Sequence, residues 1–260
     1  MDLSLNGKIA VVTGGSSGIG KATASLFLEE GCSVAVCGTN TEKLERVHRE
    51  WLDAGFSEDR LLALPCDVSS PEGPDRFADA VAGRFGGIDI WVNNAGGGIR
   101  GPFQDITEDI WKTVVNLNML SVWRGAKAAA RHMRQKGGAI VNISSYQVIM
   151  PTSYNITYAS TKGAVCTMGK LLAGELGKFG IRVNTVLPGM IETDMVRERI
   201  EKNRAAFSDT TALGRVGQPL DVANVVVFLS SQRAGFMTGS EVVVSGGKFI
   251  LQNQAKFNAV

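Results

Sequence analysis

The sequence predicts an α/β fold in which helices cover both faces of a doubly wound, parallel sheet of seven strands. Short runs that are apolar throughout alternate with longer helical segments along the whole chain. Strands without polar alternation suit a parallel sheet that is covered on both faces. A glycine-rich turn joins the first strand to the first helix, as in doubly wound sheets. The 260 residues suffice for one such domain, residues 1–260, and no linker or repeat divides them.

The strands and helices follow from local patterns. Seven apolar runs are predicted as strands, at residues 9–13, 34–37, 61–64, 88–92, 139–143, 182–187 and 241–244. The first helix is expected from Gly18 to Glu30, because Gly31 suits a helix C-terminus. Thr41 is expected as the N-cap of the second helix, which ends near Gly55. Longer helices are expected at residues 109–136, 154–179 and 218–230.

Two segments near the C-terminus stand apart from this alternation. Residues 190–217, after Pro188-Gly189, are charged and then rich in Thr, Gly and Arg. A long segment beyond the carboxyl end of a strand is expected to act as a substrate lid in this architecture. Residues 250–260 are expected to form a C-terminal tail, which either closes over the site of a neighbouring subunit or frays.

Composition and charge exclude several classes of protein. The chain is 44 % hydrophobic and 20 % charged, and its formal net charge of +2 comes without a basic run, so nucleic acid is not an expected partner. No apolar run approaches the roughly 18–20 residues of a membrane span, and the N-terminus leaves no room for a signal peptide. The four cysteines form no CxxC pair, so we expect no metal site and reduced thiols in a cytoplasmic protein.

Tyr158 and Lys162 are the first candidate catalytic pair. They lie four residues apart at the start of a predicted helix, so both side chains point from the same face. An ammonium beside a phenol favours the phenolate and is expected to lower the Tyr158 pKa from its usual value of about 10. A Tyr tuned in this way can exchange a proton with a carbonyl or an alcohol near neutral pH.

The glycine-rich turn has the sequence TGGSSGIG at residues 13–20. Its glycines let the backbone approach a pyrophosphate, which the free N–H groups and the dipole of the helix N-terminus would then hold. The same residues satisfy G-x-S-x-G, the nucleophile elbow of hydrolases. That alternative needs a late His that follows an acid, whereas the chain has only His48 and His132, both in predicted helices. We therefore reject a hydrolase.

Further motifs follow the later strands in a consistent order. They are Asp67-Val68, Asn93-Asn94-Ala95-Gly96, the stretch from Trp111 to Asn118, Ser145 at 13 residues before Tyr158, Pro188-Gly189 with Ile191 and Thr193, Thr238-Gly239, and Ser245-Gly246-Gly247. Together with the glycine turn, these motifs resemble the short-chain dehydrogenase/reductase family over nearly the whole chain. The resemblance implies a Rossmann-like sheet and an oxidoreductase that acts on CH–OH groups with a nicotinamide dinucleotide.

The resemblance also implies a catalytic set of Asn118, Ser145, Tyr158 and Lys162. Tyr158 would be the general acid in reduction and the general base in oxidation. Lys162 would hold the nicotinamide ribose and lower the Tyr158 pKa, and Ser145 would hydrogen-bond the substrate oxygen. Asn118 would anchor a water that links Lys162 to solvent.

The implied cofactor site draws on most of these motifs. It comprises Gly14, Ser16, Ser17, Gly18, Ile19, Gly20, Gly38, Thr39, Asn40, Asp67, Val68, Asn94, Ala95, Gly96, Tyr158, Lys162, Pro188, Gly189, Ile191 and Thr193. The segment of residues 37–40 lacks the carboxylate that binds the ribose 2′-hydroxyl in NAD-dependent enzymes, and it also lacks the Arg that many NADP-preferring relatives carry. We expect NADP(H), with NAD(H) as the alternative. The groups that could bind a 2′-phosphate are Thr39, Asn40, Ser16, Ser17, Lys43 and Lys21.

The substrate pocket is expected beyond the later strands, from Ser145, Gln147, Tyr154, Tyr158 and Met190. These side chains predict a mainly apolar site for a medium-sized ketone or a 3-oxoacyl group, and no Arg is evidently placed for a carboxylate. The expected reaction interconverts a ketone and a secondary alcohol. The alternatives are an NAD-dependent alcohol dehydrogenase, a dinucleotide-sensing protein without turnover, and a dinucleotide-assisted isomerase or epimerase. Family members are commonly tetramers or dimers, so the resemblance implies a homotetramer or a homodimer.

Overall fold

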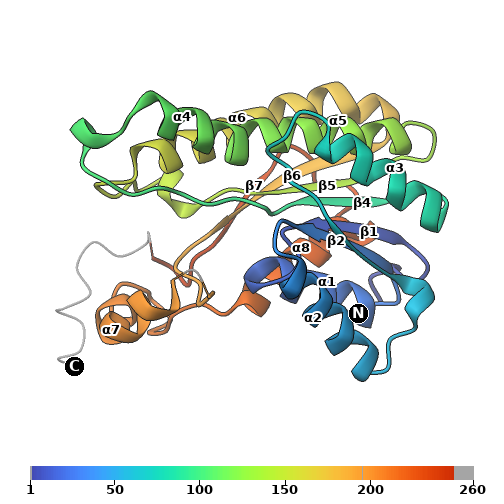
Figure 1. Cartoon of the computed structure of the whole chain (residues 1–260), viewed down its shortest axis with the longest axis horizontal. Helices are drawn as coiled ribbons and strands as arrows, with labels where there is room; N and C mark the ends of the chain where they lie inside the picture. The colour runs from blue at the N-terminus through green and yellow to red at the C-terminus, as the bar shows by residue number, and fades with distance from the viewer. Residues whose placement is uncertain (1, 195, 249–260) are drawn as a thin grey trace.

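The computed structural model describes residues 2–194 and 196–248. Their strands form one seven-stranded parallel sheet in the order β3-β2-β1-β4-β5-β6-β7, which confirms the predicted fold class (Figure 1). The strands are β1 (Ile9–Thr13), β2 (Ser33–Gly38), β3 (Leu61–Pro65), β4 (Ile90–Asn93), β5 (Gly138–Ile143), β6 (Ile181–Pro188) and β7 (Glu241–Val244). The strand order reverses between β1 and β4, where sheets of this kind form a crevice beyond the carboxyl ends of the strands.

Helices cover both faces of the sheet, as Figure 1 shows. One face carries α1 (Gly18–Glu29), α2 (Thr41–Asp53) and α8 (Pro219–Ser230). The other carries α3 (Gly73–Phe85), α4 (Glu108–Val115), α5 (Ser121–Met133) and α6 (Ile156–Leu176). Successive strand residues alternate between two apolar clusters, with Val12 and Val34 in one and Val11 and Ala35 in the other. Both faces of the central strands are therefore buried, which explains why their sequences are apolar throughout, whereas the edge strand β7 is partly exposed.

The predicted helix over residues 109–136 is interrupted. Between α4 and α5 lies a π-helical segment, Asn116–Leu120, which contains the fully buried Asn118. Such segments are frequent at functional sites. The structure also contains α3, for which the sequence analysis predicted no helix, and Gly73 and Pro74 form its first turn.

The predicted N-cap of the second helix is wrong by one residue. Asn40 is the N-cap of α2, since its side-chain oxygen accepts a hydrogen bond from the Lys43 N–H at 2.8 Å. Thr41 is instead the first residue of the helix. Asn and Thr both suit an N-cap, so the residue type alone did not decide between the two positions.

The segment of residues 190–217 is more regular than expected, because it contains α7 (Arg197–Ser208). The buried Ile200 packs with Met190 and Val216 and holds α7 against the rest of the segment. In Figure 1, α7 and α4 project at the same end of the sheet from its two opposite faces. The predicted tail, residues 250–260, lies outside the described residues. Among those that are described, no helix is both long and apolar enough to cross a membrane.

Candidate active site

The glycine turn passes from β1 to α1 at the carboxyl end of the sheet. Gly14 and Gly18 have positive φ angles of 65° and 53°, which favour glycine. A side chain at Gly15 would overlap Val36, and one at Gly20 would overlap the Gly14 carbonyl oxygen. The turn is therefore packed closely against β2 and against itself. Its backbone N–H groups lie at the start of α1, where an anion such as a pyrophosphate can be held.

Changing Gly20 to Ala is expected to destabilise the protein by about 1–3 kcal/mol, because the new methyl group would overlap a backbone atom of this turn. Gly83, in the interior of α3, is the matched control, since nothing lies within 4 Å of the position of its Cβ. Gly83→Ala should stabilise the protein by about 0.5–1 kcal/mol. Urea unfolding measures both changes, and equal effects of the two substitutions would contradict the close packing of the turn.

The Asn-Asn-Ala-Gly turn ties the end of β4 to the end of β1. The Thr13 hydroxyl oxygen accepts hydrogen bonds from the backbone N–H groups of Asn94 and Ala95, at 3.0 and 3.1 Å. The Asn94 side-chain amide donates to the Thr13 carbonyl oxygen at 2.9 Å and to that of Gly14 at 3.2 Å. These bonds hold the two strand ends together at the point where the strand order reverses.

Ser145, Tyr158 and Lys162 meet beyond β5. Ser145 follows the strand and caps a short 3-10 helix, Tyr146–Val148, and its hydroxyl hydrogen-bonds the Tyr158 side chain. The ammonium of Lys162 lies 5.8 Å from the centre of the Tyr158 ring and donates to the Ile143 carbonyl oxygen at 2.7 Å. The structure therefore brings together three of the four predicted catalytic residues.

Burial dominates the electrostatics of this cluster. It raises the pKa of the Tyr158 phenol, and the hydrogen bond from Ser145 opposes that rise. The expectation that Lys162 lowers the Tyr158 pKa below its usual value is therefore wrong for this structure, in which the ammonium bonds to a backbone carbonyl instead. Burial also lowers the pKa of Lys162 to about 8, because a charged ammonium is disfavoured away from water.

Asn118 completes the cluster from the π-helical segment. Its side-chain oxygen accepts from the Gly97 N–H at 2.9 Å, and its amide donates to the Gly97 carbonyl oxygen at 2.8 Å and to the Thr161 hydroxyl at 3.1 Å. The amide thus fixes the loop after β4 against α6. Gly96 separates Asn118 from Lys162, since a Cβ there would lie 2.9 Å from the Asn118 oxygen and 3.0 Å from the Lys162 nitrogen.

The predicted nucleotide-binding residues lie along the carboxyl ends of β1, β2, β3, β4 and β6, apart from Tyr158 and Lys162 on α6. The Ser16 hydroxyl lies 3.5 Å from the position of a Cβ on Gly38, so the glycine turn reaches the end of β2. Lys21 forms an ion pair with Glu50 of α2, which opposes its predicted role as a free charge for a 2′-phosphate. Thr193, after β6, approaches to 3.1 Å from the position of a Cβ on Gly18.

The other residues predicted to bind the cofactor or the substrate differ in their burial and in their hydrogen-bond partners. The Asp67 carboxylate accepts two hydrogen bonds from Ser69, at 2.7 and 2.8 Å, and the Val68 side chain belongs to the core. The Gln147 side chain accepts from Asn155 at 3.0 Å. Among the other predicted substrate contacts, Tyr154 is exposed with a φ of +65°, and Met190 packs under α7. The residues Pro188, Gly189 and Ile191 lie at the base of the segment that holds α7.

Two residues that hold the site together were missed. Thr13 bonds to the turn after β4, and Thr161 accepts from Asn118 and donates to the Thr157 carbonyl oxygen at 2.8 Å. Thr13 is the first residue of the glycine-rich turn at residues 13–20, and Thr161 stands directly before Lys162, so each could have been given a role from its place in or beside a motif.

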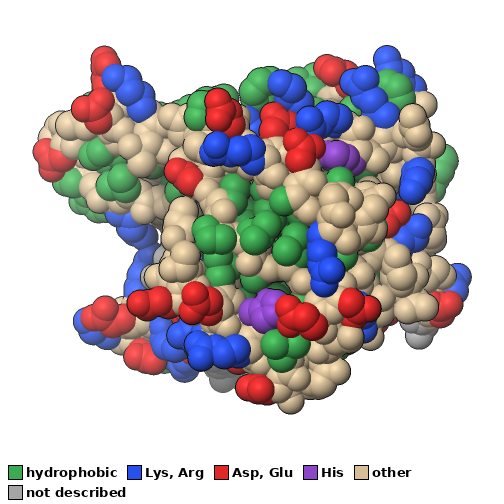
Figure 2. Space-filling view, turned by 45° about the vertical axis from the view of Figure 1, so that its right-hand side comes forward, with side chains coloured by type: hydrophobic (Ala, Val, Ile, Leu, Met, Phe, Trp, Pro, Cys, Tyr) green, Lys and Arg blue, Asp and Glu red, His purple; other side chains and the backbone are tan. Residues whose placement is uncertain are grey.

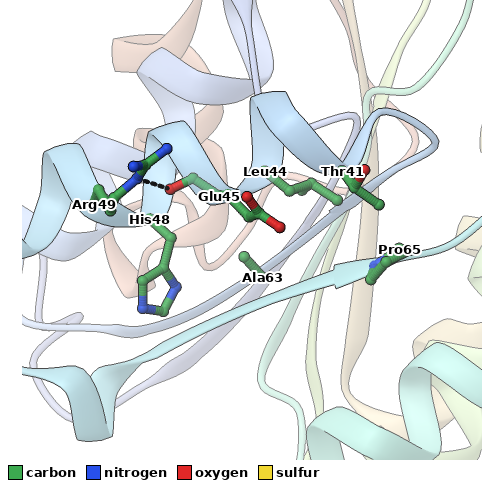
Figure 3. Close-up of a pocket in the computed structure, with 7 residues that line it drawn as sticks. All are labelled: Thr41, Leu44, Glu45, His48, Arg49, Ala63 and Pro65. Carbon is green, nitrogen blue, oxygen red and sulfur yellow. Dashed lines mark hydrogen bonds between the residues drawn. The ribbon is translucent and has the colours of Figure 1, made fainter.

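A cavity of about 450 Å³ lies elsewhere, between α2 and the edge strand β3. Figure 3 shows its lining residues Thr41, Leu44, Glu45, His48, Arg49, Ala63 and Pro65. His48 is the lining residue best suited to proton transfer, and it pairs with Glu58 at 2.9 Å. None of the predicted catalytic residues reaches this cavity. We therefore place the candidate active site at the carboxyl ends of the strands and not in this cavity at the sheet edge.

Known proteins resemble the chain over nearly its whole length. Residues 14–248 match the family model described as enoyl-(acyl carrier protein) reductase. The chain is 35 % identical over 250 residues to the 3-oxoacyl-(acyl-carrier-protein) reductase of Vibrio cholerae, which covers 96 % of this chain and 100 % of that protein. It is 34 % identical to the L-rhamnose-1-dehydrogenase of Scheffersomyces stipitis, with 95 % and 97 % covered, and 37 % identical to 3beta-hydroxysteroid dehydrogenase 1 of Eggerthella lenta, with 94 % of each covered. The chain therefore belongs to the short-chain dehydrogenase/reductase family, whose members are oxidoreductases that use NAD(P)(H).

Proposed function

We propose that the protein is an NADP(H)-dependent oxidoreductase that interconverts a ketone, or a 3-oxoacyl group, and a secondary alcohol. The observation that carries this proposal is the convergence of Ser145, Tyr158, Lys162 and Asn118 beside the glycine turn. A protein that only senses a dinucleotide has no need of a proton-transfer set. The names of the relatives, a 3-oxoacyl reductase and two dehydrogenases, support the same class of reaction.

The residues present fit a nicotinamide dinucleotide. The close packing at Gly15 and Gly20, where a Cβ would overlap Val36 or the Gly14 carbonyl oxygen, fixes the backbone of the glycine turn, and Ser17 at the N-cap of α1 keeps its hydroxyl free of a capping bond. The pyrophosphate would lie there, and Lys162 would hold the nicotinamide ribose. When bound, the cofactor supplies or accepts the hydride.

The chain's own residues would then handle the proton. Ser145 donates a hydrogen bond to the substrate oxygen, where negative charge develops during reduction. Tyr158, which burial keeps protonated at neutral pH, gives its phenolic proton to that oxygen. Asn118 holds Gly97, and with it the loop that packs on the Tyr158 ring next to Gly98. The substrate oxygen, the Ser145 hydroxyl and the Tyr158 phenol would thereby keep a fixed arrangement.

The preference for NADP(H) rests on the end of β2. No carboxylate lies in residues 37–40 to repel a 2′-phosphate, and Ser16 lies next to Gly38. We expect NADPH to bind at least about tenfold tighter than NADH, the effect of one or two charge-assisted hydrogen bonds. Fluorescence titration of the purified protein with each dinucleotide measures the ratio.

That titration, together with turnover assays on ketones and alcohols, separates the alternatives. Tighter NADH binding would overturn the cofactor preference and favour an NAD-dependent alcohol dehydrogenase. Binding of either dinucleotide without turnover of any ketone or alcohol would favour a sensing protein. Product formation without a net change in cofactor absorbance would identify an isomerase or epimerase.

A further inference from the structure

Asn155 stands at the N-cap of α6 but does not cap this helix. Its side chain makes no capping hydrogen bond, although Asn is among the residues best suited to that role. Asn40, by contrast, does cap α2 with its side chain. Asn155 is nevertheless buried, with 5 % of its surface exposed, between the exposed residues Tyr154 and Ile156. Its side chain is therefore held in the interior by a contact other than a cap.

That contact is with the side chain of Gln147. The Asn155 amide donates to the Gln147 side-chain oxygen at 3.0 Å and to the Thr152 hydroxyl at 3.4 Å. Because the Gln147 oxygen is turned toward Asn155, the two N–H donors of the Gln147 amide point away from Asn155. Within the described part of the chain, no residue accepts a hydrogen bond from these two donors. Asn155 thus decides which end of the Gln147 amide is presented to another group.

The Gln147 amide lies beside the candidate catalytic groups. Gln147 belongs to the short 3-10 helix that follows Ser145, and its backbone N–H donates to the Ser145 hydroxyl oxygen at 3.2 Å. Asn155 lies three residues before Tyr158, where the chain enters α6. The bond between the two amides therefore joins the two segments that carry Ser145 and Tyr158. The molecule is hollowed at the end where α4 and α7 project, which leaves this end of the sheet accessible to a substrate (Figure 2).

The backbone before Asn155 is held in an unfavourable conformation. Tyr154 has a φ of +65°, in the left-handed region that residues with a side chain rarely adopt. Its carbonyl oxygen accepts from the Gly101 N–H at 3.1 Å, which ties this turn to the loop after β4. Conformations of this kind persist where the surrounding structure fixes them, and they cluster at functional sites. The turn thus lacks both a relaxed backbone and a helix cap, and it brings Asn155 into contact with Gln147.

We propose that Asn155 is a positioning residue that orients the Gln147 amide, and that Gln147 determines specificity by donating a hydrogen bond to a second oxygen of the substrate. Ser145 then binds the ketone oxygen, and the Gln147 N–H binds an acceptor a few bonds away, such as the carbonyl oxygen of an ester or a thioester. The preferred substrates are 3-oxo esters and related dicarbonyl compounds rather than ketones without a second acceptor. This inference rests on the proposed function and names the substrate class of the same site.

The test compares methyl acetoacetate with 2-hexanone, in which two methylene groups replace the ester carbonyl group and the ester oxygen. The ratio of their kcat/KM values in NADPH-dependent reduction is measured for each protein, so that the different intrinsic reactivity of the two ketones cancels between proteins. Gln147→Leu and Asn155→Ala should each lower the ester-to-ketone ratio by about 3- to 10-fold, the effect of losing one neutral hydrogen bond. A purely structural role of either residue would lower both rates and leave the ratio unchanged.

Asn155→Asp tests the orientation of the Gln147 amide. A carboxylate only accepts hydrogen bonds, so it reverses the amide and directs the Gln147 oxygen toward the substrate. The ester-to-ketone ratio should then fall at least as far as in Asn155→Ala, and a wild-type ratio in Asn155→Asp would contradict the proposed orientation. Thr107→Ala is the matched control. It removes a side chain that does cap a helix, α4, by accepting from the Ile110 N–H at 3.3 Å, and it should keep the wild-type ratio.

Calorimetric titration of the NADP⁺-loaded protein with methyl acetoacetate separates this inference from the proposed function. Binding that weakens in Gln147→Leu and Asn155→Ala, but not in Thr107→Ala, supports the inference even if no ketone is reduced and the proposed function fails. Reduction of both ketones in a ratio that none of the variants changes overturns the inference and leaves the reductase intact. If the wild-type protein neither binds nor reduces the ester, both the inference and the proposed substrate class are wrong.

Discussion

Tyr158→Phe is expected to lower kcat for ketone reduction by about 10²- to 10⁴-fold, the range that general acid–base catalysis contributes. The substitution removes only the hydroxyl, so the ring still packs beneath Gly98 and the loop after β4 keeps its place. The affinity for NADPH should stay within about threefold of wild type, because the lost group acts on the proton rather than on the bound ground state. Stopped-flow reduction and fluorescence titration measure the two quantities on the same preparation.

Ser160→Ala is the matched control for this experiment. Ser160 lies two residues further along α6 on the exposed side of the helix, so the variant removes a hydroxyl from the same turn without touching the site. Its kcat should equal that of wild type. A Tyr158→Phe protein that turns over at nearly the wild-type rate would remove Tyr158 from the mechanism, whatever its affinity for NADPH.

The sheet was predictable because its signals are local. Strands covered on both faces must be apolar throughout, and seven such runs mark β1 to β7 to within a few residues. The spacing of Tyr158 and Lys162 likewise places both on one helical face. The glycine turn could also be located from the sequence, because the close packing at Gly15 and Gly20 tolerates no side chain and so requires glycine at both positions.

What escaped prediction depends on contacts between distant residues. The direction in which Lys162 points is decided by the Ile143 carbonyl oxygen, and the raised pKa of Tyr158 by burial, which no spacing of residues encodes. The side-chain amide of Asn118, in the π-helical turn, bonds to Gly97 and Thr161, which belong to two other segments.

Lys162→Met is expected to abolish turnover and yet to leave the cofactor-free protein at least as stable as wild type at pH 7. Burial lowers the pKa of Lys162 from 10.5 to about 8, so holding the ammonium in the fold costs on the order of 3 kcal/mol at neutral pH. Methionine fills a similar volume without charge. Part of the gain is offset because the Ile143 carbonyl oxygen loses its partner, a cost of about 1–3 kcal/mol. Such a balance is expected of a residue retained for function rather than for stability.

The pH dependence of stability identifies the cause. Below pH 8 Lys162 is charged in both the folded and the unfolded chain, so the full cost is present. Between pH 8 and 10.5 the unfolded chain binds the proton more strongly, and the contribution of this group to the free energy of unfolding therefore rises with pH. Any advantage of Lys162→Met over wild type should shrink across that interval. Urea unfolding at pH 7, 8, 9 and 10 measures it, with Lys178→Met, an exposed lysine just after α6, as the control that follows wild type. A constant difference between Lys162→Met and wild type from pH 7 to 10 would show that Lys162 is not held at a cost in the fold.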